Sequence, residues 1–261
     1  MPRLPVAPNR ELGQHFLADE NILHVAGRLA ALEHDDVVLE IGAGLGVLTT
    51  FLADRVRLVH AVEVDRALEP HLRERLAGRE NVELVFGDAL ALPLHELDPP
   101  PEKLVANLPY QIATPLVAES LHGLPTVRLW CVMVQSEVAD RFFASPGTRS
   151  YGAVSALVQL TAERTGLHRV SRAVFHPPPN VDSALVAFRR TREWDEGFEA
   201  LKRVVQAAFA HRRKTIVNSL ELSGVERERA TRALAALGLA PDVRAETLSP
   251  EQFVELARLL A

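Results

Sequence analysis

Short apolar runs rich in β-branched residues alternate with segments of helical periodicity along the first half of the chain. Five of these runs predict successive buried strands, at residues 37–43, 58–65, 82–88, 103–109 and 129–135. Between them, segments such as LTTFLADRV and RALEPHLRERLA place apolar side chains at the three- and four-residue spacing of an amphipathic helix. The alternation predicts an α/β fold with a parallel sheet.

Two later strand-like runs, 163–170 and 183–190, have almost no helical pattern between them. We therefore expect an antiparallel pair joined by the stiff segment FHPPPNVD, which completes a seven-stranded sheet. The strand pattern stops after Arg190, and from about Trp194 the chain is helical in pattern and rich in Ala, Leu, Arg and Glu. The sequence thus predicts one domain at residues 1–192 and a small helical domain at 193–261.

The composition is that of an ordinary globular protein: 261 residues, 48% hydrophobic and 24% charged. Cys131 is the single cysteine, which excludes an intramolecular disulfide and a multi-cysteine metal site. The chain has no apolar run of about 18 residues, and its first residues lack the apolar region of a signal peptide. We expect a cytoplasmic protein with no membrane association.

The net charge of -5 argues mildly against a nucleic-acid partner, but the charge is unevenly distributed. Residues 189–261 carry 13 Lys and Arg against 11 Asp and Glu, so the C-terminal part is slightly basic. The cations gather at Arg212, Arg213 and Lys214. Such a cluster is typical of a solvated helix face or of an RNA contact, and charge alone does not decide between them.

A glycine-rich turn, EIGAGLGVLT, follows the first predicted strand. Gly42, Gly44 and Gly46 let the backbone turn tightly and approach a ligand closely. Val47 stands where a dinucleotide-binding fingerprint has its third glycine, so the turn favours an adenosyl ligand without a pyrophosphate. A glycine turn without any ligand is the alternative.

Acidic residues end the next two strands, at the edge of an open sheet where ligands bind. Glu63 lies 17 residues after Gly46, where a carboxylate can accept from both ribose hydroxyls; Asp65, on the same strand face by alternation, is its rival. Asp88 can accept from an adenine amino group. Each acid singly is also explained as a helix cap or a solvated strand end. Together with the glycine turn, they predict S-adenosylmethionine as the cofactor.

The fourth strand ends in Asn107-Leu108-Pro109-Tyr110, a sequence suited to methylating an aromatic amine. The lone pair of adenine N6 is delocalised into the ring. The Asn107 side-chain oxygen and the Leu108 carbonyl can each accept one N6 hydrogen, which localises that lone pair for attack on the methyl group. Tyr110 offers a face on which an extruded base can stack. An ordinary strand-to-loop turn is the alternative.

Two residues directly before the prolines, Phe175 and His176, are candidates for further roles. Phe175 can close the other face of the base, or it is a core residue at a strand end. His176 is a metal-ligand type without partners at ligand spacing, so we expect no metal site.

The ordered set of motifs LGQHFL, EIGAGLGVLT, AVEVD, GDAL, NLPY, FHPPPNVDSALV and RRKT…LSPEQF resembles the ribosomal RNA adenine N6,N6-dimethyltransferases, from about Leu12 to Leu259. The resemblance implies a Rossmann-like seven-stranded S-adenosylmethionine-dependent methyltransferase sheet with a small helical C-terminal domain. It prefers Glu63 over Asp65, and its implied cofactor contacts are Gln14, His15, Leu17, Gly42, Glu63, Asp88 and Asn107. His15 stands where relatives often have Asn.

One branch of this family dimethylates two adjacent adenines in the 3′-terminal hairpin loop of small-subunit (16S) rRNA, late in subunit assembly. The other dimethylates one adenine of large-subunit rRNA. The ending RRKT…RAETLSPEQF resembles the small-subunit branch, which implies the small ribosomal subunit as partner and Arg212, Arg213 and Lys214 as RNA contacts. We expect a monomer. Two rivals remain: a methyltransferase acting on free DNA or protein amides, and a non-enzymatic assembly factor that keeps the fold.

Overall fold

The computed structural model describes residues 6–9, 12–194, 197–211 and 213–261 and divides the chain into two compact units. The first comprises residues 1–139 and 164–190, and the second comprises residues 140–163 and 191–261. The predicted boundary at residue 192 lies close to the second crossing between the units. The prediction did not include the first crossing, by which residues 140–163 join the C-terminal helices.

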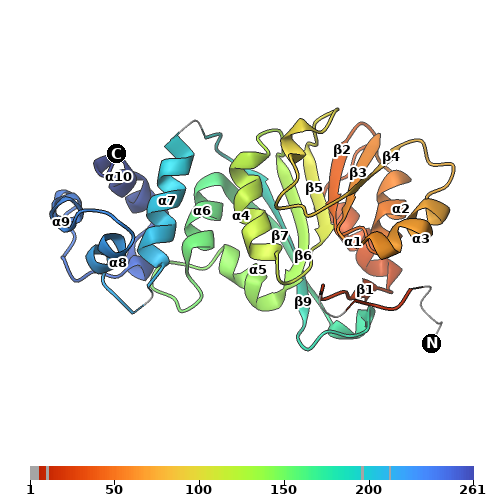
Figure 1. Cartoon of the computed structure of the whole chain (residues 1–261). Helices are drawn as coiled ribbons and strands as arrows, with labels where there is room; N and C mark the ends of the chain where they lie inside the picture. The colour runs from red at the N-terminus through yellow and green to blue at the C-terminus, as the bar shows by residue number, and fades with distance from the viewer. Residues whose placement is uncertain (1–5, 10–11, 195–196, 212) are drawn as a thin grey trace. The chain divides into compact units, whose positions relative to one another are not determined.

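A seven-stranded sheet forms the centre of the first unit (Figure 1). Its order is β4-β3-β2-β5-β6-β9-β7, and the pairs among β2 to β6 are parallel, whereas β9 is antiparallel to β6. The strands are β2 (Val37–Ile41), β3 (Leu58–Glu63), β4 (Val82–Phe86), β5 (Lys103–Asn107), β6 (Leu129–Gln135), β7 (Ala162–Val170) and β9 (Ser183–Arg190). The predicted α/β class, strand positions and seven-stranded sheet are confirmed.

One strand differs from the prediction of uniform burial. β4 is at the edge of the sheet, and its residues are partly exposed, whereas all five residues of β2 are buried. An edge strand has a neighbour on only one side, so an apolar run alone does not determine how deeply it is buried.

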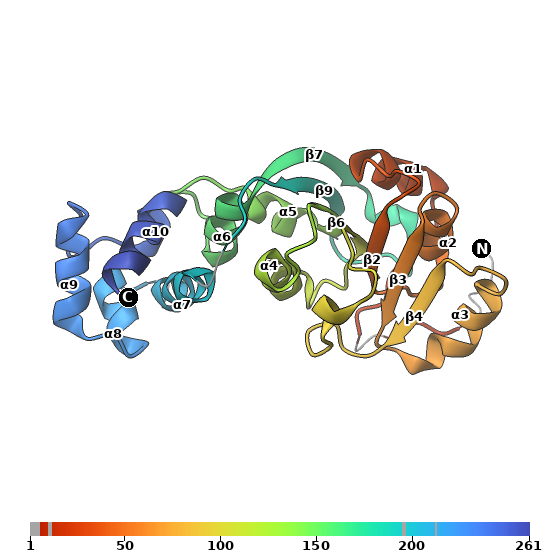
Figure 2. The ribbon, with the colours of Figure 1, turned by 90° about the horizontal axis from the view of Figure 1, so that it is seen from above.

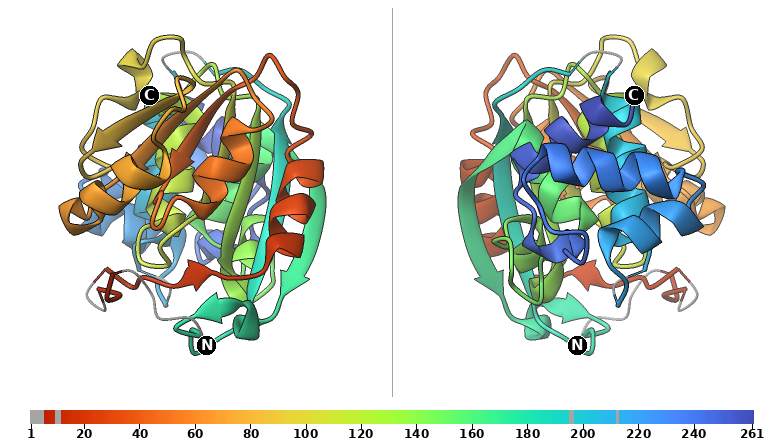
Figure 3. Two further views of the ribbon diagram at one scale, coloured as in Figure 1. Left: turned by 90° about the vertical axis from the view of Figure 1, so that its right-hand side faces the viewer. Right: turned by 90° about the vertical axis from the view of Figure 1, so that its left-hand side faces the viewer.

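Helices cover both faces of the sheet (Figures 2 and 3). On one face, α1 (Glu20–Leu29), α2 (Val47–Ala53) and α3 (Glu69–Arg75) share an apolar core with residues of β2, β3, β5, β6 and β9. On the other face lies α4 (Ala113–Gly123), where the indole Nε1 of Trp130 donates to Ser120 Oγ at 2.9 Å. Trp130 also stacks on Phe188 of β9, with ring centroids 5.2 Å apart. This packing holds α4 against β6 and β9.

A second, two-stranded sheet joins distant parts of the sequence. β1 (Phe16–Leu17) pairs antiparallel with β8 (Phe175–His176), with Phe16 opposite His176. The sequence pattern did not predict it, because two-residue strands have no periodicity. The pairing places the GQHF segment beside FHPPP.

The second unit is helical apart from the first residues of β7. It contains α6 (Ala153–Thr161), α7 (Gly197–Phe209), α8 (Ile216–Leu222), α9 (Arg227–Ala236) and α10 (Pro250–Leu259), while α5 (Ser136–Phe142) and β7 cross between the units. α6 packs against α7 and α10, and Phe209 contacts both Tyr151 and Phe253. Both units also contain short 3₁₀ helices: η1 (Arg66–Leu68), η2 (Leu94–Glu96) and η3 (Arg172–Val174) in the first unit and η4 (Ala245–Thr247) in the second.

No helix in the described ranges is both long enough and apolar enough to cross a membrane.

Candidate active site

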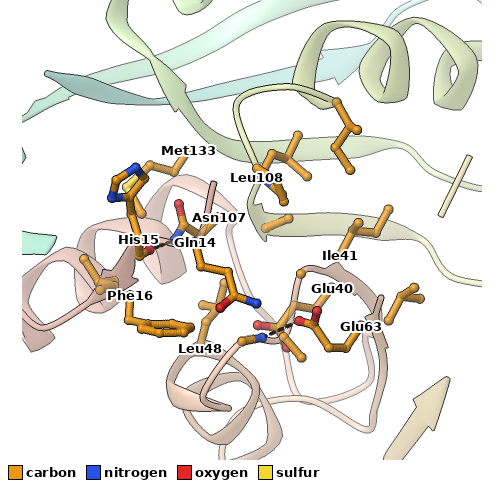
Figure 4. Close-up of a pocket in the computed structure, with 18 of the residues that line it drawn as sticks. Gln14, His15, Phe16, Glu40, Ile41, Leu48, Glu63, Asn107, Leu108 and Met133 are labelled. Carbon is orange, nitrogen blue, oxygen red and sulfur yellow. Dashed lines mark hydrogen bonds between the residues drawn. The ribbon is translucent and has the colours of Figure 1, made fainter. Parts of the chain in front are cut away.

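A cavity of about 230 Å³ opens at the carboxyl ends of the parallel strands of the first unit (Figure 4). Its walls are the glycine turn after β2, the ends of β3, β4 and β5, and the N-terminal segment 12–17. The predicted residues that line it are Gln14, His15, Leu17, Gly42, Gly44, Glu63, Asp88, Asn107, Leu108 and Tyr110. The structure thus brings together residues from five separate segments.

The glycines of the turn have different surroundings. Gly42, Gly44 and Gly46 all have positive φ, at 83°, 57° and 73°. A Cβ on Gly42 would lie 3.4 Å from Pro109 Cδ, and one on Gly44 would lie 3.4 Å from the Phe16 ring. These two glycines therefore let the NLPY segment and β1 approach the turn. Gly46 does not line the cavity; it faces Leu72 and Arg75 of α3.

We expect Gly46→Ala to destabilise the protein more than Gly78→Ala. Both residues have φ above 70°, where a Cβ costs about 1–2 kcal/mol. A Cβ on Gly46 would also lie 3.0 Å from Arg75 Cδ and 3.1 Å from Leu72 Cδ2, whereas one on Gly78 would meet nothing within 4 Å. Urea unfolding of both variants measures their losses in the free energy of unfolding, and the difference between the two losses is the contribution of packing. Equal losses would contradict the expected packing effect at Gly46.

Glu63 is the last residue of β3, and its carboxylate is fixed by the backbone. Oε2 accepts from Gly44 N at 2.8 Å, and Oε1 accepts from Val64 N and Asp65 N, both at 2.9 Å. Burial raises its pKa, while these three hydrogen bonds act in the opposite direction. A carboxylate has about four acceptor positions, so about one remains for a ligand hydroxyl. The expected acceptance from both ribose hydroxyls would require a shared position or a rearranged backbone bond.

Asp65 does not share the strand face of Glu63, because β3 ends at Glu63. Its Oδ1 accepts from Ala67 N at 3.0 Å, and its Oδ2 accepts from Gln14 Nε2 at 2.8 Å. Gln14 Oε1 in turn accepts from Asn9 N at 2.8 Å. Asp65 therefore holds the N-terminal segment in place, and both ends of the Gln14 amide are bonded within the protein.

Glu40 is a cavity residue that the sequence analysis missed. It lies in the interior strand β2, is 1% exposed, and its Oε2 has no hydrogen-bond partner within the described residues. Burial raises its pKa to about 8, and the nearby Glu63 carboxyl adds to the rise. A charged residue inside the apolar run VVLEI was the available signal, since a glutamate is almost never fully buried unless it has a partner.

Asp88 follows β4 at the exposed rim of the cavity. Its Oδ1 accepts from Leu90 N at 2.9 Å, which shapes the turn after the strand. The structure therefore places the carboxyl both as a turn cap and as a cavity residue.

Asn107 ends β5 with its amide in a defined orientation. Nδ2 lies 3.3 Å from the His15 carbonyl oxygen, as the dashed line in Figure 4 marks. A carbonyl only accepts, so the amide nitrogen must face His15 and Oδ1 is left to accept from another group. Leu108 is held beside it by its backbone N–H, which donates to the Met133 carbonyl at 3.1 Å.

Tyr110 is half-buried, and its hydroxyl lies 2.7 Å from Ser183 Oγ at the start of β9. Burial raises the pKa of the phenol, so it is neutral at physiological pH. Its ring centroid is 5.8 Å from that of His15. The hydroxyl bond anchors one end of the ring beside the cavity.

Phe175 takes the second of the two places that the sequence left open, a core position at a strand end. It is 4% exposed, pairs with Leu17 in the β1–β8 sheet, belongs to the apolar core and does not line the cavity. Its side chain therefore packs as a core residue in this structure, and the expected stacking on a base has no support.

The basic cluster is only partly described. Arg213 and Lys214 are exposed in the turn between α7 and α8, whereas Arg212 lies outside the described residues. Many other cations of the second unit have carboxylate partners, for example Arg227 with Glu221 at 2.6 Å.

Residues 7–261 match the family model described as ribosomal RNA adenine dimethylase. The chain belongs to this family. Ribosomal RNA small subunit methyltransferase A of Rubrobacter xylanophilus is 49% identical over 254 residues, which cover 97% of this chain and 95% of that protein. The family match of this chain and its similarity to a small-subunit enzyme confirm the family that the motifs indicated.

Solved structures of the dimethylase fold are similar over nearly the whole chain. A dimethyladenosine transferase from Plasmodium falciparum has a TM-score of 0.75 and 26% identity, covering 93% of this chain and 96% of its own. The 23S rRNA methyltransferase ErmE has a TM-score of 0.65 and 32% identity, covering 94% and 99%. These matches confirm the methyltransferase fold.

Proposed function

We propose that this dimethylase transfers methyl groups from S-adenosylmethionine to N6 of two adjacent adenines in the 3′-terminal hairpin loop of small-subunit rRNA. The observation that carries the proposal is one cavity lined both by the glycine turn with Glu63 and Asp88 and by Asn107, Leu108 and Tyr110. The higher identity to a small-subunit enzyme than to the 23S enzyme supports the branch.

The residues of the cavity fit this cofactor. Glu40, Glu63 and Asp88 line it, and no described lining residue is Lys or Arg. Such a cavity suits a ligand with cationic groups and hydroxyls, and it disfavours a pyrophosphate. The unpartnered Oε2 of Glu40 and the positive-φ glycines leave room for polar contacts and close backbone approach. Glu63 would accept from the ribose and Asp88 from the adenine amino group.

When bound, the cofactor supplies an electrophilic methyl group on a sulfonium. The protein's task is to orient the adenine N6 toward it. Asn107 Oδ1 and the Leu108 carbonyl would each accept one N6 hydrogen, which localises the nitrogen lone pair for in-line attack. The methylated nitrogen is acidic enough to give its proton to water, so the step needs no dedicated base. Tyr110, fixed by Ser183, would stack on the extruded base.

The experiment that tests the function uses labelled S-adenosylmethionine with undermethylated small subunits, naked small-subunit rRNA or naked large-subunit rRNA. We expect dimethylation of adjacent adenines near the small-subunit 3′ end, with the assembled particle as the better substrate. Label only on large-subunit rRNA would overturn the branch. Cofactor binding without transfer to any RNA would favour an assembly factor. Equal rates on naked rRNA and particle would contradict docking on a preassembled particle.

We further propose that Arg213 and Lys214, with Arg212, contact rRNA phosphates. Replacing Arg213 and Lys214 with alanine is expected to weaken particle binding about 10-fold at low salt and to reduce the salt slope by about 2, with unchanged cofactor affinity. Filter binding at several salt concentrations measures both quantities. The double variant of Arg232 and Arg258, two exposed cations with carboxylate partners at 3.7 and 2.7 Å, is the control. Unchanged particle affinity would assign the cluster to a solvated surface.

A further inference from the structure

Contacts to three residues of two other segments converge on His15, which comes directly before β1. Its Nδ1 lies 2.7 Å from the Pro177 carbonyl oxygen, just after β8. Its own carbonyl oxygen accepts from Asn107 Nδ2 at 3.3 Å. Its ring lies beside that of Tyr110, with centroids 5.8 Å apart and planes inclined by 31°. His15 therefore connects the N-terminal segment with the segments that carry Asn107, Tyr110 and Pro177.

The direction of the side-chain hydrogen bond is fixed by chemistry. A carbonyl oxygen has no hydrogen to give, so Nδ1 of His15 must be the donor to Pro177. This bond links the residues next to the β1–β8 pair of Phe16 and His176. It thereby restrains the backbone of His15, whose carbonyl oxygen holds the amide nitrogen of Asn107.

The side chain also points away from the acidic part of the cavity. In Figure 4 the His15 ring extends away from Glu40 and Glu63, whereas the Gln14 side chain extends toward them. The ring is thus on the side of the cavity where Tyr110 lies, and Tyr110 is the residue proposed to stack on the target base.

We propose that His15 is a positioning residue for methyl transfer: the hydrogen bond from Nδ1 to the Pro177 carbonyl fixes the backbone that orients the Asn107 amide and supports the Tyr110 ring. The inference rests on the proposed function and replaces the cofactor contact that the family resemblance implied for this side chain. His15 acts through Asn107 and Tyr110, so its loss should reduce turnover more than cofactor affinity.

Three substitutions separate the donor from the ring. Asparagine carries an N–H donor at its δ position, as histidine does at Nδ1, but has no ring. Phenylalanine keeps a ring and removes the donor, and alanine removes both. If the donor is the essential feature, His15→Asn retains methyl transfer, whereas His15→Phe and His15→Ala lose most of it.

The experiment measures kcat and the KM for undermethylated small subunits, the Kd of the cofactor by calorimetry, and the melting temperature, with the full chain. We expect kcat to fall about 10-fold or more in His15→Ala and His15→Phe, because a small misplacement of a reacting group is costly. The cofactor Kd of these variants should change less than about 2-fold. His15→Asn should retain most of the wild-type turnover. His34→Ala, which changes a 92%-exposed histidine, is the control.

Several results would overturn the inference. Wild-type turnover in His15→Ala and His15→Phe would do so, as would a raised cofactor Kd with unchanged kcat. Low turnover in His15→Asn together with high turnover in His15→Phe would show that the ring matters and not the donor. Should His15→Ala unfold, the comparison of the Asn and Phe variants still decides. A wild-type protein that methylates no rRNA would overturn the proposed function itself, a result distinct from normal turnover in the variants.

Discussion

Replacing Asn107 with alanine is expected to lower kcat for adenine methylation by about 10²- to 10³-fold, the effect of removing one preorganised polar group from a reacting centre. Cofactor affinity should weaken much less. The reason is the orientation of the amide: Nδ2 donates to the His15 carbonyl at 3.3 Å, which leaves Oδ1 to accept the N6 hydrogen. Alanine removes the acceptor that localises the nitrogen lone pair.

Single-turnover methyl transfer into undermethylated small subunits measures the chemical step, and calorimetry measures the cofactor Kd. Asn107→Asp provides a graded comparison, because a carboxylate can accept from N6 but cannot donate to His15; we expect intermediate turnover. Asn21→Ala, at an exposed position in the first turn of α1, is the matched control. Equal losses of turnover and cofactor affinity in Asn107→Ala would contradict the assigned role.

The strands and the edge that carries the site could be predicted because both depend on local pattern. Apolar runs place β2, β3, β5 and β6 within a few residues of their observed ends. In a parallel sheet the residues after each strand necessarily meet at one edge. Gly42, Glu63, Asp88 and Asn107 thus come together in the cavity although 65 positions separate the first from the last.

The remaining features depend on long-range pairing, which local pattern does not contain. The two-residue strand at Phe16 finds its partner at His176, and this pairing draws Phe175 into the core and His15 to Pro177. The sequence of the apolar helix α6 likewise does not show which neighbour the helix packs against. In the structure it packs with the C-terminal helices. Glu63 lines the cavity and Asp65 does not, because β3 ends at Glu63, a boundary that alternation cannot locate.

A second large effect is expected at Glu40, as a change in how stability depends on pH. Its carboxyl is buried in the interior strand β2, and burial raises its pKa from an ordinary 4.5 to about 8. Folding therefore favours the protonated carboxyl. At pH values between about 4.5 and 8 the unfolded chain binds fewer protons at this group than the folded chain, so the free energy of unfolding falls as the pH rises.

The size of this loss follows from the two pKa values. Each pKa unit corresponds to about 1.4 kcal/mol, so the full difference is on the order of 5 kcal/mol, reached above pH 8. Glu40→Gln keeps the shape of the side chain and cannot ionise. We expect the ligand-free variant to gain several kcal/mol relative to the wild type between pH 5.5 and pH 8.5, as measured by urea unfolding at both values. Glu33→Gln, an exposed position after α1, is the control.

The same carboxyl connects stability to the proposed cofactor. A cation bound in the cavity favours the ionised form of Glu40, so binding S-adenosylmethionine at pH 7 should release a proton. S-adenosylhomocysteine has no sulfonium charge and should release less. Calorimetry in buffers of different ionisation enthalpy counts the protons, and the difference between the two ligands should disappear in Glu40→Gln. If the free energy of unfolding changed equally in wild type and Glu40→Gln between pH 5.5 and pH 8.5, the raised pKa of Glu40 would be contradicted. If proton release on cofactor binding persisted in Glu40→Gln, the proton would have to come from another group.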